Sequence, residues 1–337
     1  MVRVAAIVPH WGRCETTETA IRALVHSTRR PEAAVIVNNS VDDRQELSAA
    51  VARLRRSAPF DLEVVNPPHN LGYLGGAVSA IRRLEAMADE FDLYWILNND
   101  ARPRPDALTA LVRCAQLPDV AIVSCLVLDG GEHRAPLVYR PWRGRFSPYA
   151  RRDGGWLGLE GVSGASFLLT ATFLSRIGHM PDHLFLYCEE VWLAWAARAA
   201  SMRVIACHAG VVDHESRTAF SRLGQPTSLR EYLNTRARLA LTVEWRPECL
   251  LTVVPLTVLR AVAEAVHGRG SLALAILAGL TDGACLRLPR IDSLGNVTLN
   301  TRGSLRTLSR QSPLSRLVAF VHAALQRKNR EPRMQCK

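Results

Sequence analysis

The chain has 337 residues, of which 48% are apolar, and a formal net charge of +11. This length suits one large α/β domain, or one such domain with an appendage, and the apolar content allows a sizeable core. The basic excess favours anionic partners such as nucleotide phosphates or a membrane surface, and it is densest in residues 301–337, which hold nine Lys/Arg and one acid. No recognised nucleic-acid-binding motif accompanies the charge, so we expect no nucleic-acid partner.

The eight cysteines include no pair with CxxC spacing, which argues against a zinc site or a thioredoxin-type motif and favours a reduced, cytoplasmic setting. The apolar N-terminal run has the length of a strand and ends at Pro9 and Gly12, so no signal peptide is predicted. The longest apolar run, 249–266, contains Arg260 and Glu264. We expect it to be too interrupted to span a bilayer.

In the first half of the chain, short apolar runs alternate with segments of helical periodicity. The predicted strands are 2–8, 33–37, 62–65, 93–97 and 120–124, and the predicted helices are 15–27, 42–56, 74–87 and 105–114. Continuously apolar strands that alternate with helices are typical of a parallel sheet covered on both faces.

The second half is less regular. Residues 130–160 are rich in Gly, Pro and Arg, which is typical of a loop or short hairpin, and 164–176 is an apolar run. A predicted helix at 185–202 carries two adjacent carboxylates near its start, and 204–216 is strand-like and then polar. The remaining predicted helices are 232–242, 250–266 and 271–280.

Polar residues follow three of the predicted strands: "NNS" at 38–40, "HNLGYLGG" at 69–76 and "NND" at 98–100. Each of these alone predicts a turn. Ligands of such sheets bind at the carboxyl ends of the strands, so three polar segments on that edge indicate a site.

A chemically sensible set of side chains is available for such a site. Asp100 could hold a divalent cation and His214 could be its second ligand, with a substrate diphosphate supplying further oxygen donors. Glu189 or Glu190 could act as a base. The simpler alternatives are a turn residue for Asp100, a structural role for His214, and helix-start acids that complement the helix dipole for the two glutamates.

Five segments, in this order, resemble the family 2 glycosyltransferases of the GT-A fold, particularly their rhamnosyl- and galactofuranosyltransferase-like branch. They are "VIVNNSVDD", "NPPHNLGYLGGAVSAI", "YWILNND", the long stretch from "GASFLL" to "VVDHES", and "REYLNTRARLAL". The resemblance covers roughly residues 3 to 290. It implies a GT-A mixed sheet with helices on both faces and a C-terminal helical extension.

The resemblance also implies a domain organisation and a reaction. The GT-A domain would be 1–228, with a nucleotide-sugar half at 1–125 and an acceptor half at 126–228, followed by helices at 229–300 and a basic tail at 301–337. The implied enzyme is a metal-dependent, inverting glycosyltransferase of the hexosyltransferase type. It transfers a sugar from a nucleotide diphosphate to an acceptor hydroxyl by single displacement, so it needs a carboxylate base but no covalent nucleophile.

The family's site residues map onto this chain by position. Asp100 and His214 match the ligands of a divalent cation, Mg2+ or Mn2+, and Glu190 matches the base, with Glu189 beside it. The nucleotide-sugar positions are Asn38, Asn39, Asp42, Asn70, Gly72, Asn98 and Arg236, and the expected acceptor-side residues are Trp156, Gly164 and Trp192.

Several positions depart from the family pattern. Asn98 replaces the first Asp of the D-x-D element, and Glu190 replaces an Asp. Trp192 and Ala196 stand where the family often has an Asp–Arg pair, so Trp192 either packs over Ala196 or lines the acceptor site. These changes motivate an alternative function, in which the chain is a catalytically weak family member that acts as a sugar-nucleotide-binding or scaffold protein.

The Asn38 amide can accept from N3–H and donate to O4 of uracil or thymine, which favours a UDP- or dTDP-sugar as donor. The sugar would be a deoxysugar such as rhamnose, or a furanose. The acceptor would be a lipid-linked glycan or a small natural-product scaffold. The helices at 250–280 could lie on the inner face of an anionic membrane, form a homodimer or cover the sheet. We expect a bacterial, cytoplasmic protein, and peripheral contact with the membrane is one of these three alternatives.

Overall fold

The computed structural model describes residues 2–40, 43–87, 90–133, 137–148, 163–178, 180–214 and 227–289. The expectations for Asp42, Trp156 and the basic tail lie outside the described residues. The described residues form two compact units, one of residues 2–139 and 146–214 and one of residues 140–145 and 227–289. The sequence placed the corresponding boundary after residue 228, and it gave no sign that residues 140–145 group with the later helices.

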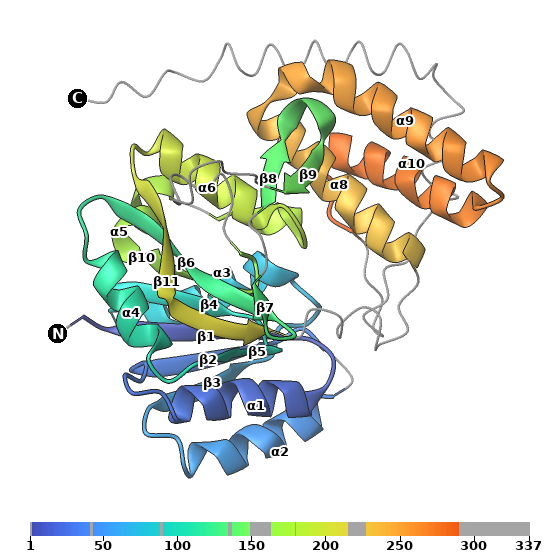
Figure 1. Cartoon of the computed structure of the whole chain (residues 1–337). Helices are drawn as coiled ribbons and strands as arrows, with labels where there is room; N and C mark the ends of the chain where they lie inside the picture. Colours follow the sequence, from blue (N-terminus) through green and yellow to red (C-terminus); the bar gives the residue numbers. More distant parts are fainter. Residues whose placement is uncertain are drawn as a thin grey trace. The chain divides into compact units, whose positions relative to one another are not determined.

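Nine strands of the described chain form one mixed sheet in the first unit (Figure 1). Its order is β3 (Asp61–Val65), β2 (Ala33–Asn38), β1 (Val4–His10), β4 (Leu93–Leu97), β10 (Ser166–Thr170), β6 (Val120–Asp129), β11 (Arg203–His214) and β5 (Ala101–Pro103), with β7 (Glu132–His133) paired to β6. The first four strands are parallel, as predicted. β10 runs antiparallel to both β4 and β6, so the sheet is mixed, as the GT-A prediction required.

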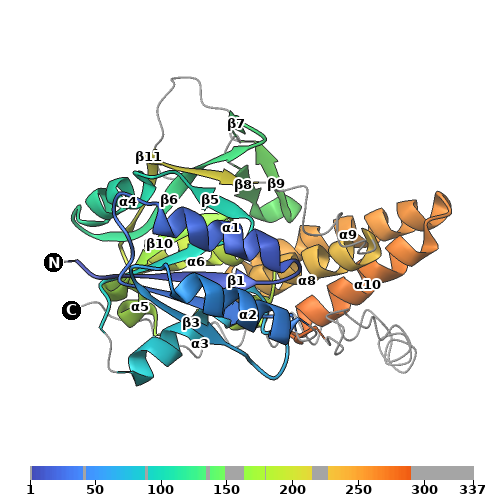
Figure 2. The ribbon, with the colours of Figure 1, turned by 90° about the horizontal axis from the view of Figure 1, so that it is seen from below.

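Helices cover both faces of this sheet (Figure 2). α1 (Cys14–Val25), α2 (Arg44–Arg55) and α4 (Ala107–Ala115) lie on one face, and α3 (Tyr73–Ala86), α5 (Ala171–Ile177) and α6 (Glu189–Ala199) lie on the other. Alternate residues of a strand point to opposite faces. Val4, Ala6 and Val8 of β1 accordingly share one buried cluster with Ile21 of α1 and Leu47 of α2.

The stretch predicted as a loop or short hairpin contains a hairpin, β8 (Leu137–Arg140) and β9 (Arg145–Pro148), around the 3-10 turn η1 (Pro141–Arg143). A second such turn, η2 (Asp182–Leu184), precedes α6. The second unit contains α8 (Thr227–Trp245), η3 (Pro247–Cys249), α9 (Leu250–Val266) and α10 (Gly270–Ala284), so the predicted helical region is present.

α8 and α10 approach each other closely because two glycines one turn apart face α8. A Cβ atom on Gly279 would lie 2.6 Å from the carbonyl oxygen of Tyr232, and one on Gly283 would lie 2.3 Å from that of Arg236. Two side-chain hydrogen bonds join α8 to the end of α10 and to the residues after it: the Tyr232 hydroxyl donates to Asp282 at 2.9 Å, and Arg236 Nε donates to the Arg287 carbonyl at 2.7 Å.

One helix in the described part of the chain, Pro247–Val266, is long and apolar enough to cross a membrane, judged by length and composition alone. Arg260 and Glu264 therefore do not exclude a spanning helix by composition, contrary to the argument from the sequence, and the expectation that this run does not span a bilayer stays a prediction. Only 28% of its apolar window is buried inside the protein, so this helix also differs from an ordinary core helix.

We predict that Gly283→Ala lowers the free energy of unfolding by about 1–3 kcal/mol, because the added methyl group overlaps backbone atoms of α8 that cannot move aside cheaply. Gly270→Ala is the matched control, since a Cβ at Gly270 meets no atom within 4 Å. Urea unfolding measures both. Equal stability of the two variants would show that α8 and α10 are not packed this closely.

Candidate active site

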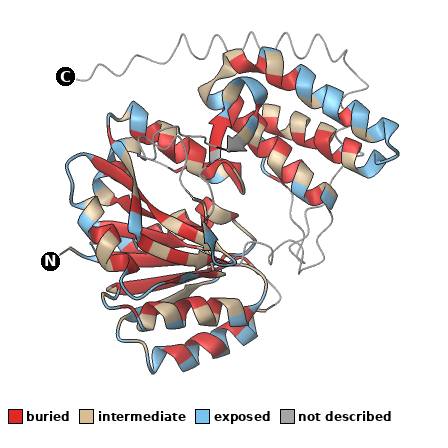
Figure 3. Cartoon of the chain, in the orientation of Figure 1, coloured by how far each residue is buried: buried red, intermediate tan, exposed pale blue. Residues whose placement is uncertain are grey.

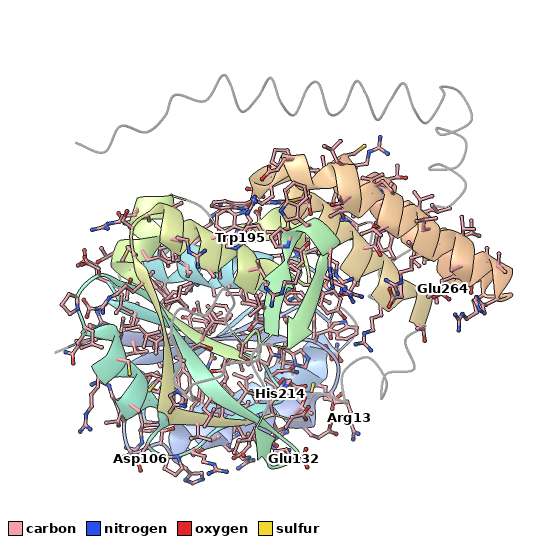
Figure 4. All side chains as sticks on the ribbon, turned by 45° about the horizontal axis from the view of Figure 1, so that its top comes forward. Arg13, Asp106, Glu132, Trp195, His214 and Glu264 are labelled. Carbon is pink, nitrogen blue, oxygen red and sulfur yellow. The ribbon has the colours of Figure 1, made fainter. Side chains whose placement is uncertain are left out.

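The "NND" turn meets the end of a distant strand. β4 ends at Leu97, the turn follows, and β5 then pairs antiparallel with β11 so that Ala101 lies opposite His214. This register brings Asp100 Oδ1 within 3.0 Å of His214 Nε2, with the two side chains 12% and 9% exposed. Figure 4 labels His214 near the end of β11. The structure thus brings together the two residues predicted as metal ligands.

The surroundings of this pair suit a divalent cation. Asn98 Nδ2 lies 3.4 Å from His214 Nε2, and the Asn98 backbone N–H donates to the Ala165 carbonyl at 2.9 Å. His214 Nδ1 is buried and has no hydrogen-bond partner among the described residues. One imidazole nitrogen and one carboxylate oxygen converge here, and carboxylate and imidazole donors suit ions such as Mn2+. The donor set therefore fits the predicted cation, and a substrate diphosphate would supply the further oxygen ligands that such an ion needs.

The two predicted base residues begin α6 after a strained segment. Phe185, Tyr187 and Cys188 have φ angles of 65°, 73° and 66°, a region that bulky residues rarely adopt and that is often found beside functional sites. Glu189 is 5% exposed, whereas Glu190 is partly exposed.

Burial shifts the protonation equilibria of both carboxyl groups. Loss of hydration raises the pKa of Glu190 to about 7. Burial, and then the neighbouring charge of Glu190, raise the pKa of Glu189 well above its usual value. A carboxylate that titrates near neutral pH is suited to accept a proton from a substrate hydroxyl.

Tyr73, which the sequence did not single out, connects these carboxylates to the "NND" turn. Its hydroxyl donates to the Gly164 carbonyl at 2.7 Å, and a Cβ on Gly164 would lie 3.8 Å from Glu190 Oε1. Burial and the nearby charges of Glu189, Glu190 and Asp100 raise the pKa of the Tyr73 hydroxyl well above its usual value. The predicted base, the predicted acceptor-side Gly164 and the predicted metal ligand therefore lie around one tyrosine.

The asparagines predicted to bind the nucleotide make hydrogen bonds within the loops of this edge. Asn38 is 1% exposed, accepts from the Ser40 backbone N–H at 2.9 Å and donates to Asn66 Oδ1 at 3.2 Å. Asn39 donates to the Gly72 carbonyl and accepts from the Leu71 N–H, at 3.0 Å each. Asn70 Oδ1 accepts from the Gly72 N–H at 2.8 Å. The structure shows these amides shaping loops, and their contact with a nucleotide stays a prediction.

Gly72 joins the start of α3 to the strained segment before α6. Its φ is 76°, and a Cβ there would lie 2.2 Å from the Phe185 carbonyl oxygen. The next residue, Tyr73, donates its backbone N–H to the same oxygen at 2.7 Å. This glycine permits a close backbone approach, so it has a structural role whether or not it also contacts the nucleotide.

Two further predicted residues are buried in helix packing. Trp192 is 3% exposed and Ala196, one turn later on α6, is 4% exposed, which favours the packing alternative for Trp192 over acceptor contact. Arg236 is fully buried in the second unit, and burial lowers the pKa of its guanidinium. Its hydrogen bond to the Arg287 carbonyl holds the residues that follow α10 against α8. A position of Arg236 near a diphosphate stays a prediction.

A series of buried and partly buried hydrogen bonds supports the "NND" turn from the opposite side. Asn99 Nδ2 donates to Thr17 Oγ1 at 3.1 Å, Thr17 Oγ1 lies 2.6 Å from His10 Nδ1, and His10 Nε2 lies 3.1 Å from Asp43 Oδ2. His10 is fully buried. These bonds tie the turn after β4 to the ends of β1 and the start of α2, so the predicted ligand Asp100 sits on a fixed support.

We predict that Thr17→Val lowers the free energy of unfolding by about 1–3 kcal/mol, because it leaves the buried His10 nitrogen without a partner. Thr17→Ser keeps the hydroxyl and is expected to recover most of that loss. Urea unfolding compares the three proteins. If Thr17→Val were as stable as the wild type, the hydrogen bond between Thr17 and His10 would not support the turn.

Comparison with known proteins gives one sequence relative of note, and no family model matches the chain. Over 201 residues the chain is 30% identical to the galactofuranosyltransferase GlfT1 of Mycolicibacterium smegmatis. The match covers 56% of this chain and 63% of that relative, slightly less than two thirds of its length.

Two solved structures share the fold. The mannosyltransferase PcManGT from Pyrobaculum calidifontis, in complex with GDP-Man and Mn2+, superposes with a TM-score of 0.51 and 16% identity over 98% of this chain and 88% of its own. GalNAc-T7 with UDP, GalNAc and Mn2+ gives a TM-score of 0.52 and 11% identity over 64% of this chain and 43% of its own. The chain therefore has the GT-A fold of glycosyltransferases, as predicted, and is related in sequence to a galactofuranosyltransferase.

Proposed function

We propose that the chain is an inverting, metal-dependent glycosyltransferase that moves a sugar from a nucleotide diphosphate to an acceptor hydroxyl. The observation that carries this proposal is the 3.0 Å approach of Asp100 and His214 in the same part of the sheet edge as the partly exposed Glu190. In such a site, the metal ligands hold the leaving diphosphate through the cation, and the separate carboxylate deprotonates the acceptor hydroxyl.

Asp100 Oδ1 and His214 Nε2 are the atoms that would hold the cation. When bound, it would neutralise charge on the leaving diphosphate. The hydrogen bonds from Asn99 to Thr17 and from the Asn98 backbone to Ala165 fix the turn, so Asp100 needs little rearrangement to bind. Preorganised ligands of this kind lose little entropy on binding.

Glu190 is the group that accepts the proton of the acceptor hydroxyl. Its carboxylate lies beside Gly164, where a Cβ atom would come within 3.8 Å of Glu190 Oε1. Glu189 is more deeply buried, and burial together with the charge of Glu190 raises its pKa well above the usual value, which favours its neutral form. A neutral Glu189 also lowers the electrostatic penalty of ionising Glu190 beside it.

The donor is inferred from the Asn38 amide and from the relative's name. The Asn38 amide retains one N–H and one oxygen lone pair beyond its bonds to Asn66 and Ser40, which matches the edge of uracil or thymine. We therefore propose a UDP- or dTDP-sugar donor. The relative's name supports a furanose such as galactofuranose, with a rhamnose-like deoxysugar as the other candidate, and the acceptor is a lipid-linked glycan or a small natural-product scaffold.

A sugar-nucleotide-binding protein without catalytic activity is the second candidate. It is favoured by Asn98, which removes one carboxylate from the site, and by the structural use of the Asn38 and Asn39 amides. Such a protein would bind the nucleotide with the cation but would not use Glu190, so separate tests of Asp100 and Glu190 distinguish the two.

We predict that UDP or dTDP binds more tightly with Mn2+ than without it, and that Asp100→Ala weakens the Mn2+-dependent binding by about 10–100-fold. Calorimetric titration of UDP, dTDP and GDP measures this. Glu132→Ala, which removes an exposed carboxylate from β7, is the control and should bind normally. Binding that ignores both Mn2+ and Asp100 would refute the metal site.

We predict that Glu190→Gln keeps nucleotide binding and lowers kcat by about 10²–10⁴-fold. The wild-type rate should rise with pH through a midpoint near 7 and level off about one unit higher, because only the ionised carboxylate accepts a proton. Since folding raises this pKa above its unfolded value, ionisation destabilises the folded protein above about pH 5, and Glu190→Gln should be more stable than the wild type at pH 8. An unchanged kcat of Glu190→Gln would show that another residue is the base. If the wild type transferred no sugar, the second candidate, a sugar-nucleotide-binding protein, would be favoured.

A further inference from the structure

The two faces of α9 are both apolar, although only one of them is buried. Leu250, Val253 and Val254 pack against Leu239 of α8 in a small core of the second unit. The opposite face is exposed along the whole helix (Figure 3). Its large side chains are Leu251 (71% exposed), Leu259 (64%), Val262 (53%) and Val266 (78%).

These four residues form one stripe. Their spacings of eight, three and four residues correspond to whole helical turns, so they lie on one side of α9. The stripe from Leu251 to Val266 is about 22 Å long at 1.5 Å per residue. A run of four large exposed apolar side chains on one face is unusual for a monomeric soluble surface and marks an interaction site.

The tip of the β8–β9 hairpin extends the stripe beyond the start of α9. Thr252 Oγ1 donates to the Trp142 carbonyl at 2.7 Å, and a Cβ on Gly144 would lie 2.9 Å from Val253 Cγ1, so the tip packs on the helix. The Trp142 side chain is 50% exposed. We call Trp142, Leu251, Leu259, Val262 and Val266 the α9 surface.

The charges around the α9 surface are mostly positive. Six arginines lie in residues 140–145 and 246–270 (140, 143, 145, 246, 260 and 269), against Glu248 and Glu264. Three of these arginines pair with carboxylates: Arg246 with Glu248, Arg260 with Glu231 of α8, and Arg269 with Glu264, at 2.5 Å each. Arg143 and Arg145 on the hairpin tip are exposed beside Trp142, so the excess charge lies next to the apolar stripe.

We propose that the α9 surface docks on an anionic lipid membrane, with α9 lying in the plane of the interface. An apolar stripe inserts between lipid headgroups, arginines attract anionic headgroups, and a tryptophan is suited to the boundary between them. The charge argues against a second copy of this chain as the occupant, because two such surfaces would bring like charges together.

The same helix is not free to span the bilayer in this fold. Val253, Val254 and Ala261 on its other face are buried within the second unit, and the Glu264 side chain, 14% exposed, pairs with Arg269. Crossing the membrane would expose this packed face to lipid and separate it from α8. Docking by one face keeps the packing intact.

The test is cosedimentation of the full chain with phosphatidylcholine vesicles that either contain or lack phosphatidylglycerol. We expect binding to the anionic vesicles that weakens at high salt. Leu259→Ser combined with Val262→Ser should reduce binding by about tenfold or more, since two apolar side chains no longer insert. Leu117→Ser removes an equally large apolar residue, 49% exposed in the first unit, and should bind like the wild type.

Three outcomes would overturn the proposal: no binding to anionic vesicles, equal binding of the double variant, or a dimer in lipid-free sedimentation velocity that the double variant abolishes. The last outcome would assign the surface to self-association. The proposal does not depend on the proposed catalytic activity. Asp100→Ala, which is expected to lose Mn2+-dependent nucleotide binding, should bind vesicles normally, so failure of one proposal leaves the other measurable.

Discussion

The antiparallel insertion of β10 between β4 and β6 is the constraint on which the candidate site depends. A strand that runs against its neighbours starts at the edge where they end, so Gly164 and Ala165, which precede β10, arrive beside the residues that follow β4. The register that pairs Ser166 with Leu97 then allows Asn98 to bond Ala165 and Tyr73 to bond Gly164. With a parallel strand in this position, the Gly164 segment would lie at the far edge of the sheet, away from Glu190 and Asp100.

Backbone strain and buried carboxyl groups lie together beside the candidate site. Three departures from ordinary backbone geometry within four residues, at Phe185, Tyr187 and Cys188, precede α6, which starts with a buried Glu189 and a partly exposed Glu190. Residues held in such conformations cost of order 1–3 kcal/mol each and persist only where surrounding contacts hold them. Here the contacts are the close approach of Gly72 and the Tyr73 N–H bond to the Phe185 carbonyl. Partly or fully buried carboxylates with raised pKa values add to that cost, which is the usual pattern of a functional site rather than of a structural helix start.

The sequence predicted the elements well because hydrophobic runs and helical periods are local signals. The strand 93–97 was predicted with both of its observed ends, and the helices on both faces followed from the alternation. The direction of β10 and the pairing of β5 with β11 were not predicted, since neither leaves a local signal. The hydrogen bonds that link Asn99, Thr17, His10 and Asp43 join residues far apart in sequence, so no local pattern predicts them. Tyr73 lies in a glycine-rich segment in which the glycines, and not the tyrosine, were the recognisable feature. Asn38 and Asn39 show the opposite problem, because an amide at a strand end looks the same in sequence whether it binds a ligand or closes a loop.

The position of the Asn98 side chain beside His214 gives a physical reason for an amide, in place of a carboxylate, at this site. The Asn98 side chain lies 3.4 Å from His214 Nε2, which is itself 3.0 Å from Asp100. A carboxylate at position 98 would place two like charges around one imidazole in a little-exposed corner, where they repel each other more strongly than in water. A bound cation would relieve that repulsion. An amide at position 98 removes it, so the arrangement of Asp100 and His214 does not depend on a bound cation. In the proposed metal site, these two residues would be the ligands that the turn and β11 supply.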